Sequence, residues 1–465
     1  MQQLPRRRPS RNVLVAVTTL VALLLAGVTG AEVRGPGGPS TAAATQPVAP
    51  AVPGTTAPSP ADDAAADTAP TPADEDARWV SAWQGSPTTS VGAAQGSCPA
   101  GDGLSDQTVR NVVQVSTGGT SVRVRVSNAF GTEPLQVGAA SVAVAGAGAD
   151  VVPGTLRPLS FAGRPTLLVP EGSEALSDPV PLDVQPLQRL ALSVFLPDRT
   201  GPATQHPIAR GTNYLATSDR TQDDGAGAFD TSITCWLFAS GVDLQAPSSV
   251  VGTVVTLGDS ITDGERSSPD AAQRYPDWLA RRLAALPGDT LAVSNAGISG
   301  NELIRSLPPG TAGAAAAARL ERDVLGQSGV RAVLLLEGIN DIGAAGAQAG
   351  DLIAVYRQLV LRAHDAGLPV YGGTLTPFGG SAAGGSYGTP GGEAQRQAVN
   401  EWIRSSGAFD GVVDFDAALR DPADPAQLLP VYDSGDHLHP SDAGYRAMAE
   451  AVDLQQLLDG ATARD

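Results

Sequence analysis

The sequence of 465 residues contains no lysine, only two cysteines and four histidines, and few aromatic side chains, which make up 4% of it. All 30 basic residues are arginines, and 48 acidic residues outnumber them, which leaves a formal net charge of -18. Because nucleic-acid binding needs a basic surface to neutralise phosphates, this balance argues against a nucleic-acid partner. Acidic membrane surfaces are poor partners for the same reason.

No apolar run reaches the ~20 residues that a membrane-spanning helix needs. The run over residues 13–26, about 14 residues long, follows four arginines and precedes small residues up to Ala31. This order is typical of a secretory signal. We therefore expect residues 1–31 to be a cleaved signal peptide of a secreted protein with no stable membrane partner. An uncleaved segment that tethers the chain to the membrane is the alternative.

The two cysteines, Cys98 and Cys235, have no further Cys or His close by at metal-ligand spacing, so a zinc site is not expected. In an exported chain, a single pair of cysteines is more often bonded than free. A disulfide between them closes a loop of more than a hundred residues, which the chain-entropy model values at about 4 to 5 kcal/mol. Two buried thiols are the alternative.

The length and the 42% apolar content are sufficient for two cores rather than one. Residues 32–77 are rich in Ala, Pro and Thr and have almost no large apolar side chains, so they predict a disordered linker. Residues 78–246 alternate apolar and polar positions, as in Val122, Val124 and Val126, with turn residues between the runs. This pattern predicts an antiparallel β-sandwich domain.

Residues 247–465 have a different pattern, in which unbroken apolar runs alternate with segments of helical spacing. Such strands are buried on both faces of a parallel sheet, so the pattern predicts a three-layer α/β/α domain. The expected strands are 250–257, 290–295, 330–336, 368–375 and 411–415. The expected helices begin at Tyr275, Ala314, Asp351 and Glu393, and a final helix begins near Ser441.

Three of the expected strands end in loops that suit catalysis, because ligands bind outside the carboxyl ends of parallel strands. Ser260 follows the first strand after Gly258 and Asp259, although capping a helix is the ordinary role of a serine at such a place. The second strand ends in the glycine-rich segment 295–301, whose amides can donate to a developing negative charge. Asn340 follows the third strand and can donate through its side-chain amide.

Two of the four histidines, His437 and His439, lie in the segment before the final helix. Asp436 is three residues before His439, a spacing at which its carboxylate can reach the imidazole and fix the tautomer. His437 is then expected to point elsewhere. A metal site built from Asp436 and both histidines is a rival interpretation, but it lacks further ligands at regular spacing. The pattern around His364 is that of a surface helix.

These segments resemble the four sequence blocks of SGNH hydrolases, also called GDSL esterases. The blocks are GDSI from Gly258, NAGISGN from Asn295, GIND from Gly338 and DHLH from Asp436, and they follow one another in the family's order. Ile261 stands where the family name has Leu, at a position that packs rather than reacts. The β-rich region upstream is also similar to the domain that precedes the catalytic unit in some bacterial members.

The resemblance implies Ser260 as nucleophile, His439 as general base and Asp436 as its orienting partner. It implies an oxyanion hole made by the Ser260 and Gly300 backbone amides and the Asn340 side chain, with Gly297 as a second candidate for the glycine. A catalytic site of this kind requires no metal or organic cofactor. The expected function is a secreted serine esterase acting on a small-molecule or polysaccharide ester through an acyl-Ser260 intermediate, with short acyl groups such as acetyl on carbohydrate as a hypothesis.

Other functions remain open at this point. Ser386 lies in GGSYG, which satisfies the G-x-S-x-G nucleophile pattern, but its flanks predict flexible loop rather than the strand and helix that this motif needs. A polysaccharide-binding or surface protein with weak or vestigial esterase activity is possible, with Trp79, Trp83 and Trp236 as contact residues. An acyltransferase can use the same catalytic residues.

Overall fold

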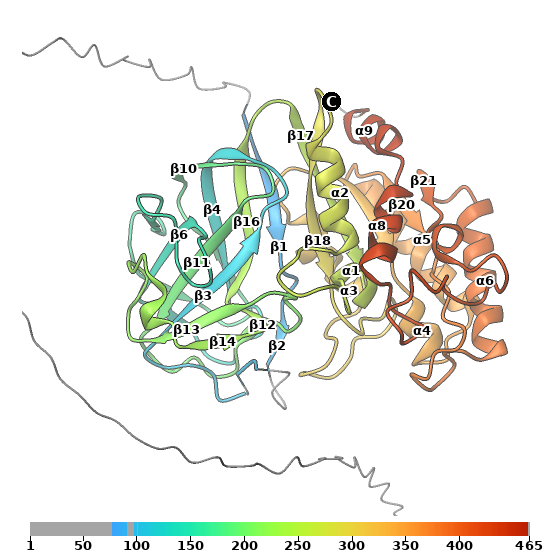
Figure 1. Ribbon diagram of the computed structural model, residues 1–465, viewed down its shortest axis with the longest axis horizontal. Helices are drawn as coiled ribbons and strands as arrows, with labels where there is room; N and C mark the ends of the chain where they lie inside the picture. The colour runs from blue at the N-terminus through green and yellow to red at the C-terminus, as the bar shows by residue number, and fades with distance from the viewer. Residues whose placement is uncertain (1–76, 91–96, 100, 464–465) are drawn as a thin grey trace, which may run out of the picture. The chain divides into compact units, whose positions relative to one another are not determined.

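The computed structural model describes residues 77–90, 97–99 and 101–463. The predicted signal peptide, residues 1–31, and all of the predicted linker except Ala77 lie outside these ranges. The described strands and helices belong to one compact unit. In Figure 1 the antiparallel strands run from blue to green and the α/β region from yellow to red. In the described ranges, no helix has the length and apolar character needed to cross a membrane.

The N-terminal region is built from antiparallel sheets. In one sheet β1 (Arg78–Gln84), β16 (Ala239–Ala246), β4 (Gly119–Ser127) and β10 (Val180–Val184) are neighbours in that order, and β9 (Glu174–Leu176) also pairs with β4. The other large sheet has the order β14 (Thr231–Ile233), β13 (Asn213–Thr217), β3 (Gln107–Gln114), β11 (Arg189–Leu196), β6 (Ala139–Val144) and β7 (Arg157–Pro158). The smaller elements are β2 (Thr88–Thr89), β5 (Leu135–Val137), β8 (Leu167–Val169), β12 (Thr204–His206), β15 (Trp236–Leu237) and the 3-10 turn η1 (Ala226–Ala228).

The predicted alternation is present in these strands. Val122, Val124 and Val126 of β4 are buried in the core of the N-terminal region, whereas Arg123 and Arg125 between them are partly exposed. Cys98 and Cys235 belong to the same core and form a disulfide across a sequence separation of 137 residues. The strand pattern and the cysteine pairing therefore agree with the expectations from the sequence.

The C-terminal region contains a parallel sheet with the strand order β18 (Thr290–Gly297), β17 (Val250–Gly258), β19 (Val330–Leu336), β20 (Val370–Gly373) and β21 (Gly411–Val413). Every residue of β17 is buried. Because the first strand lies between β18 and β19, the strand order reverses at β17. Ligands bind at such a switch point in open α/β sheets, outside the carboxyl ends of the strands.

Two groups of helices cover this sheet and complete the three layers. In one group α2 (Tyr275–Ala284) packs on β18 and on α8 (Asp442–Glu450), and α9 (Leu454–Thr462) contacts β17 and β19. In the other group α5 (Ala349–Asp365) contacts β20, α3 (Ala316–Leu320) and α6 (Pro390–Ser405). Three short helices follow strands directly: α1 (Ser260–Asp263), α4 (Ile339–Gly343) and α7 (Phe415–Leu419).

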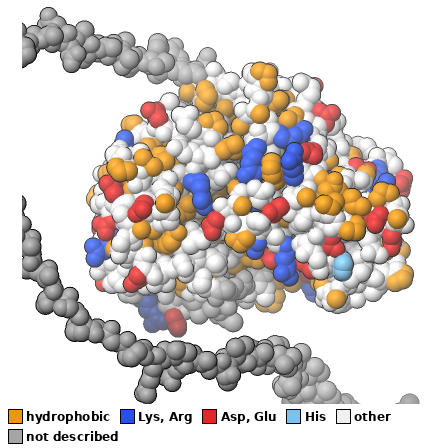
Figure 2. All heavy atoms as spheres, viewed as in Figure 1, with side chains coloured by type: hydrophobic (Ala, Val, Ile, Leu, Met, Phe, Trp, Pro, Cys, Tyr) orange, Lys and Arg blue, Asp and Glu red, His pale blue; other side chains and the backbone are white. Residues whose placement is uncertain are grey.

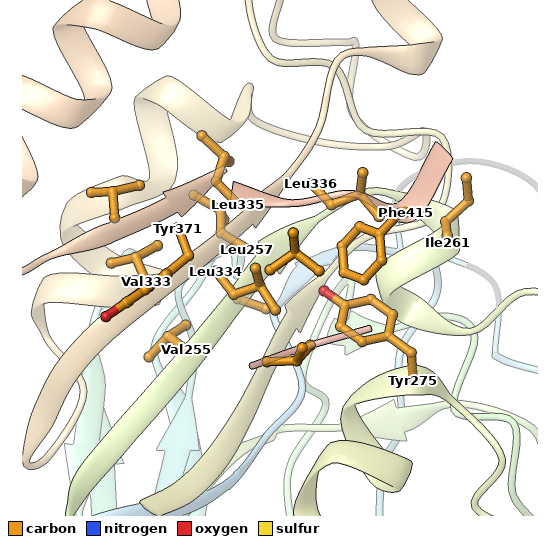
Figure 3. Packing of buried hydrophobic residues seen from close by; sticks show 14 of the residues in the cluster. Val255, Leu257, Ile261, Tyr275, Val333, Leu334, Leu335, Leu336, Tyr371 and Phe415 are labelled. Atoms are coloured by element: carbon orange, nitrogen blue, oxygen red, sulfur yellow. The ribbon is translucent and has the colours of Figure 1, made fainter. Parts of the chain in front are cut away.

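The core of the α/β region is drawn in Figure 3, where side chains of β17 and β19 meet aromatic rings from helices. Tyr275 and Phe415 are fully buried, and their ring centroids lie 5.4 Å apart. Complete burial of a large apolar side chain contributes about 1.5 to 3 kcal/mol. The sheet that carries the strand ends is therefore stabilised by a large buried core. On the surface shown in Figure 2, unlike in the core, acidic, arginine and apolar side chains are intermixed.

The antiparallel and parallel regions are joined by buried polar contacts, because β1 packs against β17 and β18. The hydroxyl of Ser294 in β18 donates to Oε1 of Gln84 at 3.0 Å, and Nε2 of Gln84 donates to the Asp323 carbonyl at 3.1 Å. Ser81 and Ser294 hydroxyls are 3.0 Å apart. Each such bond contributes about 0.5 to 1.5 kcal/mol net, so the two regions are held together by directional contacts.

Several expected bounds differ from the structure: β20 is shorter than the strand expected over residues 368–375, and α5 and α6 begin two and three residues earlier than expected. Two further differences have a clear physical reason. The helix expected from Ala314 is α3 followed by a π-helical turn, η2 (Glu321–Leu325), and in this wider turn the Asp323 carbonyl accepts from Gln84. The strand expected over residues 411–415 ends at Val413, because the side chain of Asp414 accepts from the Ala417 N–H and caps α7. Neither difference moves a candidate site residue.

Candidate active site

Ser260 lies at the carboxyl end of β17, in the first position of α1. The side chain of Asp259 caps this helix by accepting from the Ile261 N–H at 2.9 Å. Gly264, with φ +88°, ends the helix after one turn, a left-handed conformation that favours glycine. The N–H groups in the first turn of a helix have no acceptor within the helix, so the Ser260 amide is available to a ligand.

The Ser260 hydroxyl is joined to His439 and, through it, to Asp436. The Ser260 Oγ and His439 Nε2 atoms are 2.9 Å apart, and His439 Nδ1 is 2.8 Å from Asp436 Oδ2. Because the carboxylate can only accept, Nδ1 carries the proton and Nε2 has the free lone pair. The serine hydroxyl therefore donates to Nε2, which is the arrangement of a nucleophile and its general base.

Asp436 is fixed by several donors besides the imidazole. Its Oδ1 accepts from the backbone N–H groups of His439 at 2.8 Å and Leu438 at 3.0 Å, and Arg266 Nε donates to Oδ2 at 3.2 Å. Burial alone would raise the pKa of Asp436, but the hydrogen bonds from His439 outweigh burial and lower it well below its usual range. The carboxylate is therefore charged at neutral pH and can stabilise an imidazolium.

The three candidate donors of the oxyanion hole follow β17, β18 and β19. Gly300 has φ +75°, and an added Cβ would lie 3.3 Å from Ala312, so glycine suits this turn. The other candidate glycine, Gly297, already donates its N–H to Asn295 Oδ1 at 2.8 Å. This engagement favours Gly300 over Gly297 as the backbone donor.

The Asn340 amide, in α4 after β19, is oriented by two hydrogen bonds. Its Nδ2 donates to the Asn301 carbonyl at 2.8 Å, and its Oδ1 accepts from the Tyr387 hydroxyl at 2.5 Å. An amide nitrogen has two N–H bonds, so one remains for a ligand. Asn340 is 7% exposed. The loop that contains Tyr387 thus determines which end of the Asn340 amide is the donor.

Ser386 lies in that same loop, and its surroundings differ from those of a nucleophile. No strand directly precedes it, since β20 ends at Gly373, and residues 374–389 are irregular up to α6. Its backbone N–H donates to the Gly343 carbonyl at 2.7 Å. The GGSYG segment supports the site through Tyr387 and does not provide the strand and helix that G-x-S-x-G requires.

Buried carboxyl groups lie next to the site residues in the sequence and share the core with Arg319. Burial raises the pKa of Asp259 to about 7, and burial with the nearby Asp259 charge raises that of Glu337 well above its usual range. Within the described ranges, Asp259 Oδ2 and Glu337 Oε2 accept no hydrogen bond. Arg319 Nη2 lies 3.8 Å from Glu337 Oε2, so a buried positive charge lies among these carboxyl groups.

Two further buried charged residues connect the strand-end loops. Arg319, 2% exposed, donates to the Gly258 and Ala296 carbonyls at 2.8 and 2.6 Å and to Asn301 Oδ1 at 3.0 Å. Asp341 accepts from the Leu303 and Ile304 N–H groups, in the segment after Gly300. The ends of β17 and β18 are thus tied to one guanidinium.

The remaining candidates are placed away from Ser260. His437 Nδ1 lies 2.5 Å from Asp433 Oδ2, whereas His439 Nδ1 contacts Asp436. The two histidines therefore bind different carboxylates and do not form a metal site with Asp436. His364 Nε2 is 2.7 Å from Asp410 Oδ2, and its side chain is 36% exposed. This agrees with the expectation of a surface helix at His364.

The tryptophans of the antiparallel region lie mainly inside it. Trp83 and Trp236 are both 6% exposed, and their ring centroids are 5.0 Å apart in an edge-to-face arrangement. The Trp79 ring is covered by the Arg123 guanidinium, 3.9 Å from its centroid. Flat binding of a polysaccharide needs exposed ring faces, so these contacts do not favour the binding-module alternative.

Four further parts of the site were not predicted from the sequence: Tyr387, Arg319, Glu337 and the pair formed by His206 and Asp263. His206 Nε2 lies 3.0 Å from Asp263 Oδ1, and both side chains are 3% exposed. The scarcity of histidine could have drawn attention to His206, because it is the only one in the antiparallel region. The other residues carry no local signal, since their roles depend on contacts between distant segments.

A family model described as the GDSL-like Lipase/Acylhydrolase family matches residues 256–447. No curated protein matches the chain. Similar solved structures include the native aryl esterase of M. smegmatis, with 18% identity over 44% of this chain and 98% of that one and a TM-score of 0.35. They also include a carbohydrate acetylesterase family member from Sinorhizobium meliloti (16%, 45% and 99%, TM-score 0.35) and a GDSL-like lipase from Bacteroides thetaiotaomicron (17%, 44% and 86%, TM-score 0.33).

Proposed function

Because residues 256–447 form a GDSL-like lipase/acylhydrolase domain, we propose that this chain is a secreted serine esterase whose nucleophile is Ser260. The observation that carries the proposal is the line of hydrogen bonds from Ser260 Oγ through His439 to Asp436, at 2.9 and 2.8 Å. A helix-capping serine would need no imidazole at its hydroxyl, and this imidazole has the tautomer of a general base.

The proposed reaction begins with attack of Ser260 Oγ on the carbonyl carbon of a carboxylic ester. The hydroxyl proton passes to His439 Nε2, and Asp436 stabilises the resulting imidazolium. The negative charge on the carbonyl oxygen is met by the Ser260 and Gly300 N–H groups and the Asn340 amide. Collapse of this intermediate breaks the ester C–O bond, and the departing alcohol takes the proton from His439.

The second half of the reaction releases the acyl group. Water attacks the acyl-Ser260 carbonyl and gives its proton to His439 Nε2, the same donors stabilise the second oxyanion, and the Ser260 hydroxyl is restored. An alcohol in place of water would give acyl transfer with the same residues. Product analysis in the presence of an alcohol acceptor separates the two: free acid as the main product supports hydrolysis, and a new ester supports the transferase alternative.

We propose short acyl groups, such as acetyl on a carbohydrate, as the substrate class. Long acyl chains need a continuous apolar surface. The large apolar side chains that are exposed in the described ranges are few and come from separate segments: Val152, Leu168, Ile304, Leu361, Val412 and Val431. A panel of p-nitrophenyl esters from acetate to palmitate tests this class. We expect kcat/KM to be highest for acetate, and a maximum at long chains would contradict the proposal.

Secretion is supported by the basic, apolar and small residues of segment 1–31 and by the disulfide, which forms in oxidising compartments. We expect the mature protein recovered outside the cell to begin near residue 32. N-terminal sequencing of that protein tests this, and an intact Met1 on a membrane-bound product would favour the tethered alternative.

The direct test of esterase function compares two serine variants of the full chain. Ser260→Ala should reduce hydrolysis of p-nitrophenyl acetate by several orders of magnitude, on the scale of ~10⁴-fold or more for removal of a nucleophile. Ser386→Ala is the matched control, because it removes the same hydroxyl from the rejected G-x-S-x-G segment, and it should retain wild-type kcat. Loss of activity in the Ser386 variant alone would overturn the assignment of the nucleophile.

A further inference from the structure

A loop of the antiparallel region, residues 206–212, is bonded to the segment that follows the proposed nucleophile, residues 263–274. Thr212 donates to Asp270 through its N–H and its hydroxyl, at 2.7 and 2.8 Å, and the Asp270 N–H donates to the Arg210 carbonyl at 2.9 Å. Arg210 in turn donates to the Ser267 carbonyl, and Arg274 to that of Ala209. The two segments are therefore locked to one another.

At the centre of this contact His206 is held as an imidazolium. The side chain is 3% exposed. Nδ1 lies 3.0 Å from the Ser86 carbonyl, while Nε2 lies 3.0 Å from Asp263 Oδ1 and 3.3 Å from the Ile208 carbonyl. Carbonyl and carboxylate oxygens only accept, so both ring nitrogens must carry protons. Burial would lower the pKa of His206, but the Asp263 carboxylate outweighs burial and raises it.

Asp263 connects this imidazolium to both halves of the proposed site. It is the last residue of α1, the turn that begins with Ser260, and its N–H donates to the Asp259 carbonyl at 2.9 Å. Its Oδ2 accepts from the Ser299 N–H at 3.1 Å, directly before Gly300. One carboxylate therefore links the turn of the nucleophile to the turn of the glycine donor, with its Oδ1 fixed by His206.

We propose that His206 is a positioning residue for the reaction at Ser260, acting through Asp263, so that the antiparallel region forms part of the catalytic unit. This inference rests on the proposed esterase function. A buried carboxylate that loses its hydrogen-bond donor is expelled from its position or protonated. Either change loosens the Ser299–Gly300 turn relative to Ser260, and misplacement of about 1 Å near a reacting centre can cost ~10²-fold in rate.

Two substitutions at His206 separate positioning from general stabilisation. His206→Gln keeps an N–H donor near the place of Nε2, facing Asp263, whereas His206→Asn keeps one near the place of Nδ1, facing the Ser86 carbonyl. Both variants remove the positive charge and leave a buried polar group of similar kind. His364→Ala is the matched control, because it breaks another histidine–aspartate pair, with Asp410, on the surface of α5.

The measurements are kcat and KM for p-nitrophenyl acetate and the thermal melt of each full-length variant. We expect His206→Asn to lower kcat about 10- to 100-fold with KM within about threefold, and His206→Gln to retain kcat within about fivefold. His364→Ala should match the wild type in both constants. Asp263→Asn, which keeps the shape and removes the charge, should reproduce the loss and replaces His206→Asn if that variant does not fold.

Equal kcat values for the Gln and Asn variants of His206, or a higher value for the Asn variant, would refute the inference. The esterase function would still stand in that case, provided that the wild type hydrolyses the ester. A wild-type chain that hydrolyses no ester would instead count against the proposed function. In that case the rate at which a serine-directed phosphonate labels Ser260 in the two variants still compares their geometry, and equal labelling rates would refute the positioning role.

Discussion

Replacing Asn340 by Ala removes the side-chain donor of the proposed oxyanion hole and leaves the backbone donors in place. Loss of one such donor costs about 2.7 to 4 kcal/mol of transition-state stabilisation, so kcat should fall about 10²- to 10³-fold with little change in KM. The substitution also removes the bonds to the Asn301 carbonyl and the Tyr387 hydroxyl. The free energy of unfolding should therefore decrease by about 1 to 3 kcal/mol.

The assay is steady-state hydrolysis of p-nitrophenyl acetate together with denaturant unfolding. Asn111→Ala is the control for lost stability, because Asn111 is fully buried in β3 and makes two side-chain bonds to the backbone of Leu237. The control should lose a similar amount of stability and keep wild-type kcat. A reduction in kcat of less than about threefold for Asn340→Ala would remove Asn340 from the mechanism.

Three other predictions concern stability. Burial raises the pKa of Asp436, but the hydrogen bonds from His439 outweigh burial and lower it. The stabilisation from these bonds is therefore complete above about pH 4 and is lost as pH falls through the pKa of Asp436 in the folded state. Asp436→Asn should flatten the fall of the unfolding free energy between about pH 5 and 2, and an unchanged fall would contradict this. Burial lowers the pKa of His206, but the carboxylate of Asp263 outweighs burial and the charge of Arg274 and raises it. The stabilisation from this ion pair is therefore complete below about pH 6.5 and is lost as pH rises through the pKa of His206 in the folded state. His206→Asn should flatten the fall of the unfolding free energy at alkaline pH, and equal slopes for the variant and the wild type would argue against the ion pair. Reduction of the disulfide should lower the free energy of unfolding by about 2 to 5 kcal/mol. The measurement is the Tm with and without reductant, and an unchanged Tm would show that the bond does not constrain the unfolded chain.

Much of the fold and the candidate site could be predicted from local sequence patterns. β19 has the expected bounds, Val330–Leu336, because its run is apolar except for Arg331 and is flanked by Gly329 and Glu337. Asp436 and His439 were paired from their spacing, and Ser260, the segment 295–301 and Asn340 were singled out by their positions after successive strands. The choice of Gly300 within that segment came from the family resemblance. Carboxyl ends of parallel strands meet at one edge, so the parallel direction of these strands brings the loops to the same side of the sheet.

The parts that could not be predicted depend on contacts between distant segments. His206 and Asp263 are 57 residues apart, and Tyr387 and Asn340 are 47 apart, in loops whose approach follows from tertiary packing. Apolar periodicity carries no information about which loops meet. The same limit explains why the antiparallel region looked separable from the site, although one of its buried side chains contacts the turn of the proposed nucleophile.

The central claim is that Ser260 is a nucleophile activated by His439, and covalent labelling tests it most directly. The full-length wild type, His439→Ala and His437→Ala are treated with a serine-directed phosphonate, and the labelled peptide is mapped by mass spectrometry. We expect a single label on Ser260 in the wild type and in His437→Ala, and a large loss of labelling in His439→Ala. A label on another serine, or equal loss for both histidine variants, would contradict it.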